Sequence, residues 1–241
     1  MNKQSAIVFG GSSGIGEASA RALLATGQSV TITGRDEPKL TSAGKRLAEH
    51  GTVHTVVADG RDREAVEHVF EVSGPVDDVV ICVSGGQGAG LFRELDLDEV
   101  RSALEQKTMA QLTIAQVAAR HLGAGGSITF VTAASARSVI RGTAGLAAVN
   151  GAIEALVPIL ALELAPIRVN AVSPGIIYTP WWDAMPRGAR DAFFETATAT
   201  LPVRRIGAPE EVAGLIATIA QTGFLTGSVY EIDGGSHLVT Q

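Results

Sequence analysis

The sequence predicts a single α/β domain in which a parallel sheet is doubly wound, with helices on both faces. The first observation is that short apolar runs rich in β-branched residues alternate with longer segments of helical period. Repeated strand–helix alternation implies right-handed crossovers and therefore parallel strands. The second observation is the length: 241 residues without an internal repeat, a low-complexity tract or a polar linker suit one domain over residues 1–241.

Seven apolar runs are expected to form the strands: residues 6–9, 29–33, 53–58, 78–83, 127–132, 168–172 and 228–232. The first six are short and rich in β-branched side chains, which is typical of strands buried on both faces. Segments of helical period lie between them, at residues 14–26, 38–50, 62–71, 98–121 and 143–164. Residues 178–201 hold both tryptophans and interrupt the alternation, so we interpret them as a substrate-loop insertion over the carboxyl edge of the sheet.

The composition excludes several classes of protein. A single cysteine, Cys82, excludes an intrachain disulfide framework and fits a reducing compartment. The net charge is −6 without a run of Lys or Arg, so no nucleic-acid partner is expected. The N-terminus lacks the apolar core of a signal peptide. The most apolar stretch, residues 152–167, carries two glutamates and is shorter than the roughly 20 residues that span a bilayer, so we expect a cytoplasmic protein without a membrane partner.

Lysine and tyrosine are unusually scarce. The chain has four lysines, none of them after Lys107, and two tyrosines, Tyr178 and Tyr230. A mechanism that needs a Tyr–Lys pair in the second half of the chain is therefore excluded by composition alone.

A glycine-rich turn follows the first expected strand and precedes the first helix. Its sequence is Gly10-Gly11-Ser12-Ser13-Gly14-Ile15-Gly16. Glycines at this spacing permit a tight turn, the close approach of a phosphate and close packing of helix on sheet. The free N–H groups and partial positive charge of a helix N-terminus suit a pyrophosphate. The turn therefore predicts a Rossmann-type domain that binds a dinucleotide.

The end of the second strand bears on which dinucleotide binds. An acidic residue there favours NAD because it accepts hydrogen bonds from the ribose 2′-hydroxyl. This sequence has Gly34-Arg35-Asp36 instead, and the Arg35 guanidinium suits a 2′-phosphate, with Ser12 or Ser13 nearby. We therefore favour NADP(H) over NAD(H). Two alternatives stay open, a solvated Arg35 and an Asp36 turned toward the ribose.

Taken together, these motifs resemble the short-chain dehydrogenase/reductase family over nearly the whole chain. Further matches are Asp59, the strand from Arg168 to Gly175, and the closing Asp233-Gly234-Gly235. The segment Val83-Ser84-Gly85-Gly86 stands where the family has Asn-Asn-Ala-Gly after the fourth strand. The resemblance implies that Asp59 bonds the adenine and that Thr179 holds the nicotinamide carboxamide. The other cofactor contacts that it implies are Gly60, Ser84, Gly85, Pro174, Gly175 and Ile177.

The resemblance does not extend to the family's catalytic tetrad of Asn, Ser, Tyr and Lys. Leu146 aligns with the family's Tyr and Asn150 with its Lys, while Ala133 stands at the Ser position and Lys107 at the Asn position. In the family the Tyr protonates the developing alkoxide. Loss of a positioned general acid typically costs about 10²–10⁴ in rate, so hydride transfer here needs another proton donor.

Lys107 is the first candidate for that donor. It interrupts an apolar stripe on the helix expected at 98–121, which places an ammonium group on the buried face. Burial lowers the pKa of a lysine and suits it to acid–base work near neutral pH. Alternatively, the side chain extends to the surface or bonds carbonyls in a structural network.

Ser135 and Tyr178 complete the catalytic candidates. Ser135 lies two residues past Ala133, where its hydroxyl would bond a substrate carbonyl unless it only caps the loop. Tyr178 adjoins Thr179 and brings a phenol near the nicotinamide unless it points to solvent.

Four further side chains are assigned to the substrate pocket. Arg137 and Arg141 would bind an anionic substrate unless they are solvated. Trp181 and Trp182 are expected to cover an apolar or ring-shaped substrate unless they pack against a neighbouring subunit or the core. The five histidines and the cysteine show no metal-ligand spacing, so no metal is expected.

The sequence thus predicts an NADP(H)-dependent oxidoreductase that reduces the carbonyl of a small substrate with a non-standard proton donor. Two alternatives stay open: a non-redox cyclase, isomerase or lyase on the same scaffold, and a cofactor-binding pseudo-enzyme. The helix at 143–164 has more apolar positions than one core-facing stripe needs, among them Ile153, Leu156, Leu160 and Leu164. Because this helix packs on its symmetry mate in the resembled family, we expect a homodimer or homotetramer.

Overall fold

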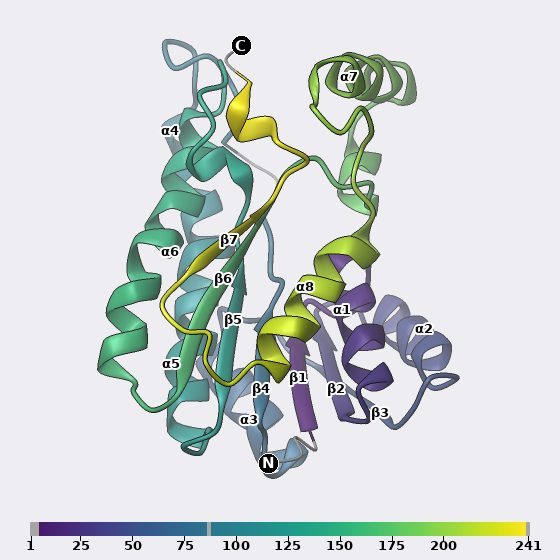
Figure 1. The fold of residues 1–241 in the computed structure, drawn as a ribbon, viewed down its shortest axis with the longest axis vertical. Coiled ribbons are helices and arrows are strands. Elements are labelled where there is room, and N and C mark those ends of the chain that lie inside the picture. Colours follow the sequence, from purple (N-terminus) through teal and green to yellow (C-terminus); the bar gives the residue numbers. More distant parts are fainter. Residues whose placement is uncertain (1–4, 86–87, 240–241) are drawn as a thin grey trace.

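The computed structural model describes residues 5–85 and 88–239. These residues form a parallel sheet in the order β3-β2-β1-β4-β5-β6-β7, with helices on both faces (Figure 1). The strands are β1 (Ser5–Phe9), β2 (Ser29–Gly34), β3 (Val53–Val57), β4 (Asp78–Ile81), β5 (Ser127–Val131), β6 (Arg168–Pro174) and β7 (Val229–Ile232). The doubly wound parallel fold is therefore confirmed. The strand order reverses between β1 and β4, and ligands bind at such a switch point, outside the carboxyl ends of the strands.

Two helical layers enclose the sheet. On one face α3 (Arg63–Ser73), α5 (Ala110–His121) and α6 (Ala144–Glu163) bury their apolar sides. On the other face lie α1 (Gly14–Ala25), α2 (Glu37–Leu47) and α8 (Pro209–Gln221). Figure 1 shows α5 and α6 on the left of the sheet and α1, α2 and α8 on the right. Each face therefore has its own hydrophobic core.

The structure differs from the sequence predictions at three elements. Helix α8 was not expected, although Pro209 and two glutamates in the first turn mark its start. The expected helix at 98–121 consists of α4 (Leu97–Ala103), a π-helical segment (Leu104–Met109) and α5. The expectation that β3 is buried on both faces is wrong, because β3 is an edge strand and His54, Thr55 and Val57 are exposed.

Helix α6 also bears on the membrane prediction. Its 20 residues are long and apolar enough to cross a bilayer, with a mean hydropathy of 1.8. The expectation that the most apolar stretch is too short to span a bilayer is therefore wrong. A third of that window is buried inside the protein, and Ile153 and Val157 pack into the core against the sheet. Length and composition alone do not distinguish a membrane span from such a core helix.

Residues 178–201 stand over the carboxyl edge of the sheet. They contain a short 3₁₀ helix (Pro180–Ala184) and α7 (Arg187–Thr200). In Figure 1, α7 lies above α8 and apart from the helical layers. This segment follows β6 and therefore starts at the edge where the predicted site residues gather.

Candidate active site

The glycine turn has a backbone that only glycine adopts easily. Gly10 and Gly14 have φ of +79° and +55°. A Cβ on Gly16 would lie 2.1 Å from the carbonyl oxygen of Gly10. The N–H groups of Gly10 and Gly11 both donate to the Thr33 carbonyl, at 3.1 and 3.0 Å, which ties the turn to the end of β2. The turn is thus a cradle, a concave backbone surface that a side chain at Gly10 or Gly16 would fill.

Helix α1 begins directly from this turn. Ser13 is its N-cap residue and makes no side-chain capping bond, so the N–H groups of the first turn, including those of Ile15 and Gly16, are left for a ligand. Thr179, which follows β6 far along the chain, lies beside Gly14, where an added Cβ would be 3.3 Å from the threonine side chain. The two predicted ends of the cofactor site therefore meet in the fold, and these residues fit a dinucleotide.

The end of β2 supplies the second part of the site. An added Cβ on Gly34 would lie 3.2 Å from Ser12 Oγ, so Ser12 is adjacent to the residue before Arg35. Arg35 is exposed. The Asp36 carboxylate caps α2 by accepting from the Lys39 N–H at 3.0 Å, and this engagement weighs against its use on a ribose.

Asp59 follows β3 and pairs with Arg61. Arg61 Nη2 lies 2.6 Å from Asp59 Oδ2, and this hydrogen-bonded guanidinium holds the pKa of Asp59 below its usual value. The charge of Arg35 acts in the same direction. The next residue, Gly60, is buried, and a Cβ there would lie 2.7 Å from Ile114 of α5. The pairing with Arg61 therefore favours the ionised form of Asp59.

The remaining predicted cofactor residues lie after β4 and β6. Ser84 is exposed and Gly85 packs near Gln106, while Gly86 lies outside the described residues. Pro174 ends β6, and a Cβ on the next residue, Gly175, would lie 2.7 Å from the Asp233 Cα, so no other residue fits there. Ile177 is buried, and its carbonyl accepts from Trp182 Nε1 at 2.8 Å.

Lys107 lies on the π-helical segment between α4 and α5, and it is only 7% exposed. Its Nζ donates to the Thr132 carbonyl at 3.2 Å. Burial lowers the pKa of Lys107 to about 8, although Cys82 and the carboxylate of Glu154 act in the opposite direction. The predicted buried ammonium is therefore found, at a pKa that suits proton transfer.

Glu154 on α6 is a functional candidate that sequence reasoning missed. Its buried carboxylate accepts from Thr132 Oγ1 at 2.7 Å, from Ser173 Oγ at 2.8 Å and from Arg137 Nε at 2.8 Å. Thr132 thus bonds Lys107 through its carbonyl and Glu154 through its hydroxyl. The only signal in the sequence was an acidic residue inside a strongly apolar helix.

Ser135 and Asn150 also come together. Ser135 lies in a 3₁₀ turn (Ala134–Ala136), half-buried, and its Oγ accepts from Asn150 Nδ2 at 3.1 Å. Asn150 is 4% exposed, and its Nδ2 donates as well to the Leu146 carbonyl at 3.0 Å. The turn after β5 thus packs on the face of α6 that carries Leu146 and Asn150, the residues at the family's Tyr and Lys positions.

Arg137 has other partners than a substrate. Besides Glu154 it bonds Glu231 of β7, with Nη1 to Oε1 at 2.8 Å. Because two carboxylates already bind its Nε and Nη1, this pairing weighs against the predicted use of Arg137 on an anionic substrate. Arg141 is exposed, and among the described residues no partner is found for it.

Residues 178–201 form an aromatic cluster. Trp182 packs edge-on against Trp181 at a centroid distance of 4.7 Å and against Phe194 of α7 at 5.4 Å. Its ring is tilted by 31° to that of Phe193, at a centroid distance of 5.1 Å. Tyr178 packs on Phe194 at a centroid distance of 5.8 Å and is 60% exposed. Trp182 therefore packs α7 against the segment that follows β6, and these contacts lie within one subunit.

Three potential metal ligands meet near the C-terminus, although their sequence spacing gave no signal. The ligand atoms of Glu231, Asp233 and His237 lie within 4.8 Å of one another. His237 Nδ1 bonds Asp233 Oδ2 at 2.9 Å, and this contact raises the pKa of His237. All three side chains form ion pairs with one another or with Arg137, so their proximity is explained without a metal ion.

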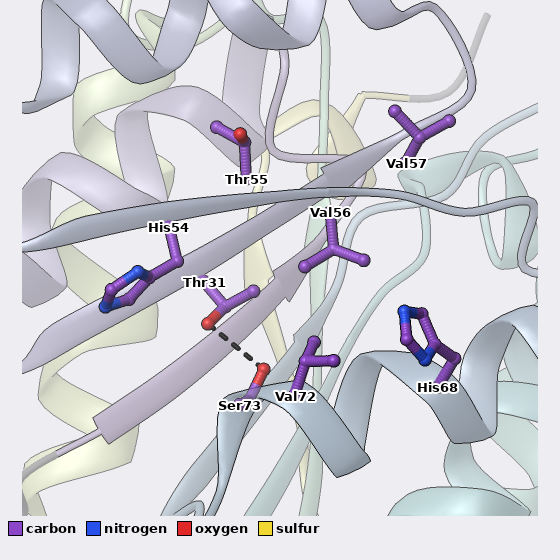
Figure 2. Close-up of a pocket in the computed structure, with 8 residues that line it drawn as sticks. All are labelled: Thr31, His54, Thr55, Val56, Val57, His68, Val72 and Ser73. Atoms are coloured by element: carbon purple, nitrogen blue, oxygen red, sulfur yellow. Dashed lines mark hydrogen bonds between the residues drawn. The ribbon is translucent and has the colours of Figure 1, made fainter.

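A cavity of about 490 Å³ lies elsewhere, between edge strand β3 and α3. His54 and His68 flank it, and Ser73 donates to Thr31 at 3.1 Å between them (Figure 2). None of the predicted site residues lines this cavity. The chemistry is thus gathered at the carboxyl edge of the sheet and not here.

The fold and the site define a Rossmann-type α/β protein with a nucleotide cradle at the β1–β4 switch point. A family model described as enoyl-(acyl carrier protein) reductase matches residues 10–237. The chain belongs to the short-chain dehydrogenase/reductase family and is an oxidoreductase of that type. The family expected from the sequence is therefore confirmed.

Three similar proteins illustrate this membership. The cyclic-di-GMP-binding biofilm dispersal mediator protein of Escherichia coli is 32% identical over 95% of this chain and 94% of its own length. The short-chain dehydrogenase/reductase ATR9 of Stachybotrys chlorohalonatus is 31% identical over 98% of this chain and 97% of its own. A crystal structure of a small-chain dehydrogenase in complex with NADPH superposes with a TM-score of 0.83 at 32% identity, covering 98% and 100% of the two chains.

Proposed function

We propose that this protein is an NADP(H)-dependent reductase of a small carbonyl compound, and that Lys107 supplies the proton. The observation that carries the proposal is the buried Lys107 ammonium at the carboxyl edge of the sheet, with a pKa of about 8. A proton donor works best when its pKa is near the working pH. The aligned Tyr and Lys positions hold Leu146 and Asn150, so the standard pair is replaced.

The residues around the glycine turn would hold the cofactor. The cradle from Gly10 to Gly16 and the free N–H groups of α1 would bind the pyrophosphate. Thr179, which lies beside Gly14, would bind the nicotinamide end. The exposed Arg35, next to Ser12, supports a 2′-phosphate and hence NADP(H) over NAD(H). The similarity to a structure in complex with NADPH points the same way.

When bound, NADPH supplies the hydride that converts the carbonyl carbon to an alcohol carbon. The carbonyl oxygen then takes one proton, so one NADPH and one proton are consumed for each alcohol formed. Lys107 Nζ would hold that proton, and the interaction with Glu154 raises the pKa of Lys107 and so favours its ammonium form. Ser135 would donate to the carbonyl oxygen, and Tyr178 would reach the same region from the rim.

The substrate class follows from the aromatic cluster. Trp181 is 44% exposed and Phe193 38% exposed beside the carboxyl edge, which supports an apolar or ring-containing substrate. The single described cysteine, half-buried as a free thiol, is compatible with a cytoplasmic location.

A direct test compares Lys107→Met with the wild type. NADPH and NADH oxidation is followed with a panel of ketones and aldehydes, and we expect the variant to lose about 10²–10⁴ in kcat/KM. Lys45→Met, an exposed lysine on α2, is the matched control and should keep full activity. Full activity of Lys107→Met would remove Lys107 from the mechanism, and equal use of NADH would contradict the cofactor preference.

The aligned Leu146 and Asn150 also favour a second candidate, a protein of this scaffold without redox turnover. One form is a cyclase, isomerase or lyase, which would form product without any change in NADPH absorbance. Another is a cofactor-binding pseudo-enzyme. The similarity to the Escherichia coli protein described as binding cyclic-di-GMP supports this form. Stoichiometric NADPH oxidation would exclude both.

We also propose a homodimer or homotetramer. Ile159 and Leu162 of α6 are 50% and 80% exposed, so this helix presents an apolar outer face. Ile153, one of the positions expected to be in excess, is instead fully buried in the core.

A further inference from the structure

The orientation of the Asn150 side-chain amide is fixed by its own helix. Nδ2 lies 3.0 Å from the Leu146 carbonyl oxygen, four residues earlier on α6. A reversed amide would place Oδ1 against that oxygen, where two acceptors repel each other. The group that faces Leu146 is therefore the NH₂ group, a pure donor.

The same Nδ2 lies 3.1 Å from Ser135 Oγ. A serine hydroxyl has one hydrogen and two acceptor sites. Because Asn150 donates to one acceptor site, the Ser135 hydrogen has to point away from Asn150. Within residues 5–85 and 88–239 no group accepts it, and Ser135 is half-buried rather than sealed off.

We propose that Asn150 is a positioning residue that holds the Ser135 hydroxyl as a hydrogen-bond donor toward the substrate oxygen. The proposal rests on the proposed function and deepens it. Lys107 Nζ donates to the carbonyl of Thr132, three residues before Ser135, so two donors flank one short segment. An acceptor such as a substrate carbonyl oxygen would complement these donors.

Charged groups on the elements around Asn150 bear on any pH test. Lys107 lies on the π-helical segment, Arg137 follows the 3₁₀ turn, and Glu154 lies one turn further along α6. Arg137 and Glu154 are paired with each other. All three are unchanged in the variants below, and Ser135→Ala, which introduces no charge, shows their own contribution to the pH profile.

Asn150→Asp tests the proposal because it keeps the size of the side chain and reverses its role. The introduced carboxylate would accept from Ser135, and the hydroxyl would then donate to that carboxylate instead of the substrate. We expect kcat/KM for carbonyl reduction to fall about 10²–10³-fold at neutral pH, the range found when one oxyanion-hole donor is lost. The loss should shrink as the pH is lowered, because a protonated carboxyl donates again.

Ser135→Ala should cause a similar loss without this recovery at low pH. In the Ser135→Ala background, Asn150→Asp should add nothing, since it acts through Ser135. Unchanged NADPH affinity of the variants checks that the fold is kept. Additive losses, or a loss from Asn150→Asp at every pH alike, would overturn the proposal.

If the wild type oxidises NADPH with none of the carbonyl compounds, the proposed function is refuted. The positioning role of Asn150 is then tested separately, in a binding assay. Cyclohexanone then serves as the carbonyl probe, and its affinity is followed by tryptophan fluorescence. Asn150→Asp and Ser135→Ala should weaken cyclohexanone binding equally, and unchanged affinity in both would overturn the inference.

Discussion

Lys107 carries an energetic conflict at the scale of a single residue. Burial lowers its pKa from 10.5 to about 8. Between these values the unfolded chain binds more protons than the folded protein, so stability rises with pH over this window. Below the folded pKa the penalty is fully present, at about 3 kcal/mol from 1.36 kcal/mol per pKa unit. A side chain placed this way costs stability at neutral pH, which is consistent with the proposed role in proton transfer.

Lys107→Met should therefore make the protein more stable at pH 7, because the apolar side chain has no charge to desolvate. The difference in free energy of unfolding between variant and wild type should diminish from pH 8 to pH 10.5. Chemical denaturation at a series of pH values measures it. A variant less stable than the wild type at pH 7 would show that the ammonium is held by more favourable contacts than its single bond to Thr132.

At the scale of an element, the glycine turn allows little change. Gly16→Ala would bring a Cβ to 2.1 Å from the Gly10 carbonyl oxygen. We expect the turn to open, with a loss of about 1–3 kcal/mol in stability, typical of overpacking, and at least tenfold weaker NADPH binding. Nucleotide fluorescence titration and thermal unfolding measure the two effects.

Gly214→Ala is the matched control, because no atom lies within 4 Å of a Cβ added there on α8. It should stabilise the helix by about 0.5–1 kcal/mol and leave NADPH binding unchanged. An equal loss of NADPH affinity in both variants would contradict a specific role for the turn.

Much of the element scale could be predicted from the sequence, because strands β1, β2, β4, β5 and β6 are short runs that contain apolar and β-branched residues, as in a buried parallel sheet. The exposure of β3 could not, since an edge strand and a central strand share that composition. The π-helical segment that carries Lys107 depends on a hydrogen-bond register that leaves no mark in the apolar pattern.

The candidate site divides in the same way. The burial of Lys107 follows from an interrupted stripe on one helix, so local periodicity is enough. The contact of Ser135 with Asn150 spans 15 residues and depends on how the turn after β5 packs against α6. No period or spacing encodes that path.

At the scale of the whole molecule, the outer face of α6 predicts self-association. Leu162→Glu would place a charge on a position that is 80% exposed, so it should leave the monomer fold intact and shift an oligomer toward 24.8 kDa. Light scattering coupled to size-exclusion chromatography measures the mass. Val57→Glu, on the β3 edge and 50% exposed, is the control. A wild type that already elutes at the mass of one chain would contradict the proposed oligomer.

The ion pairs beneath the carboxyl edge have an evolutionary consequence. From Glu154 through Arg137 and Glu231 to His237, acid and base alternate, and together they join α6, the turn after β5 and β7. Loss of Arg137 leaves the carboxylates of Glu154 and Glu231 without the guanidinium between them, so a single substitution there is penalised more than a matched double one. Among relatives, these positions are therefore expected to drift in pairs rather than one at a time.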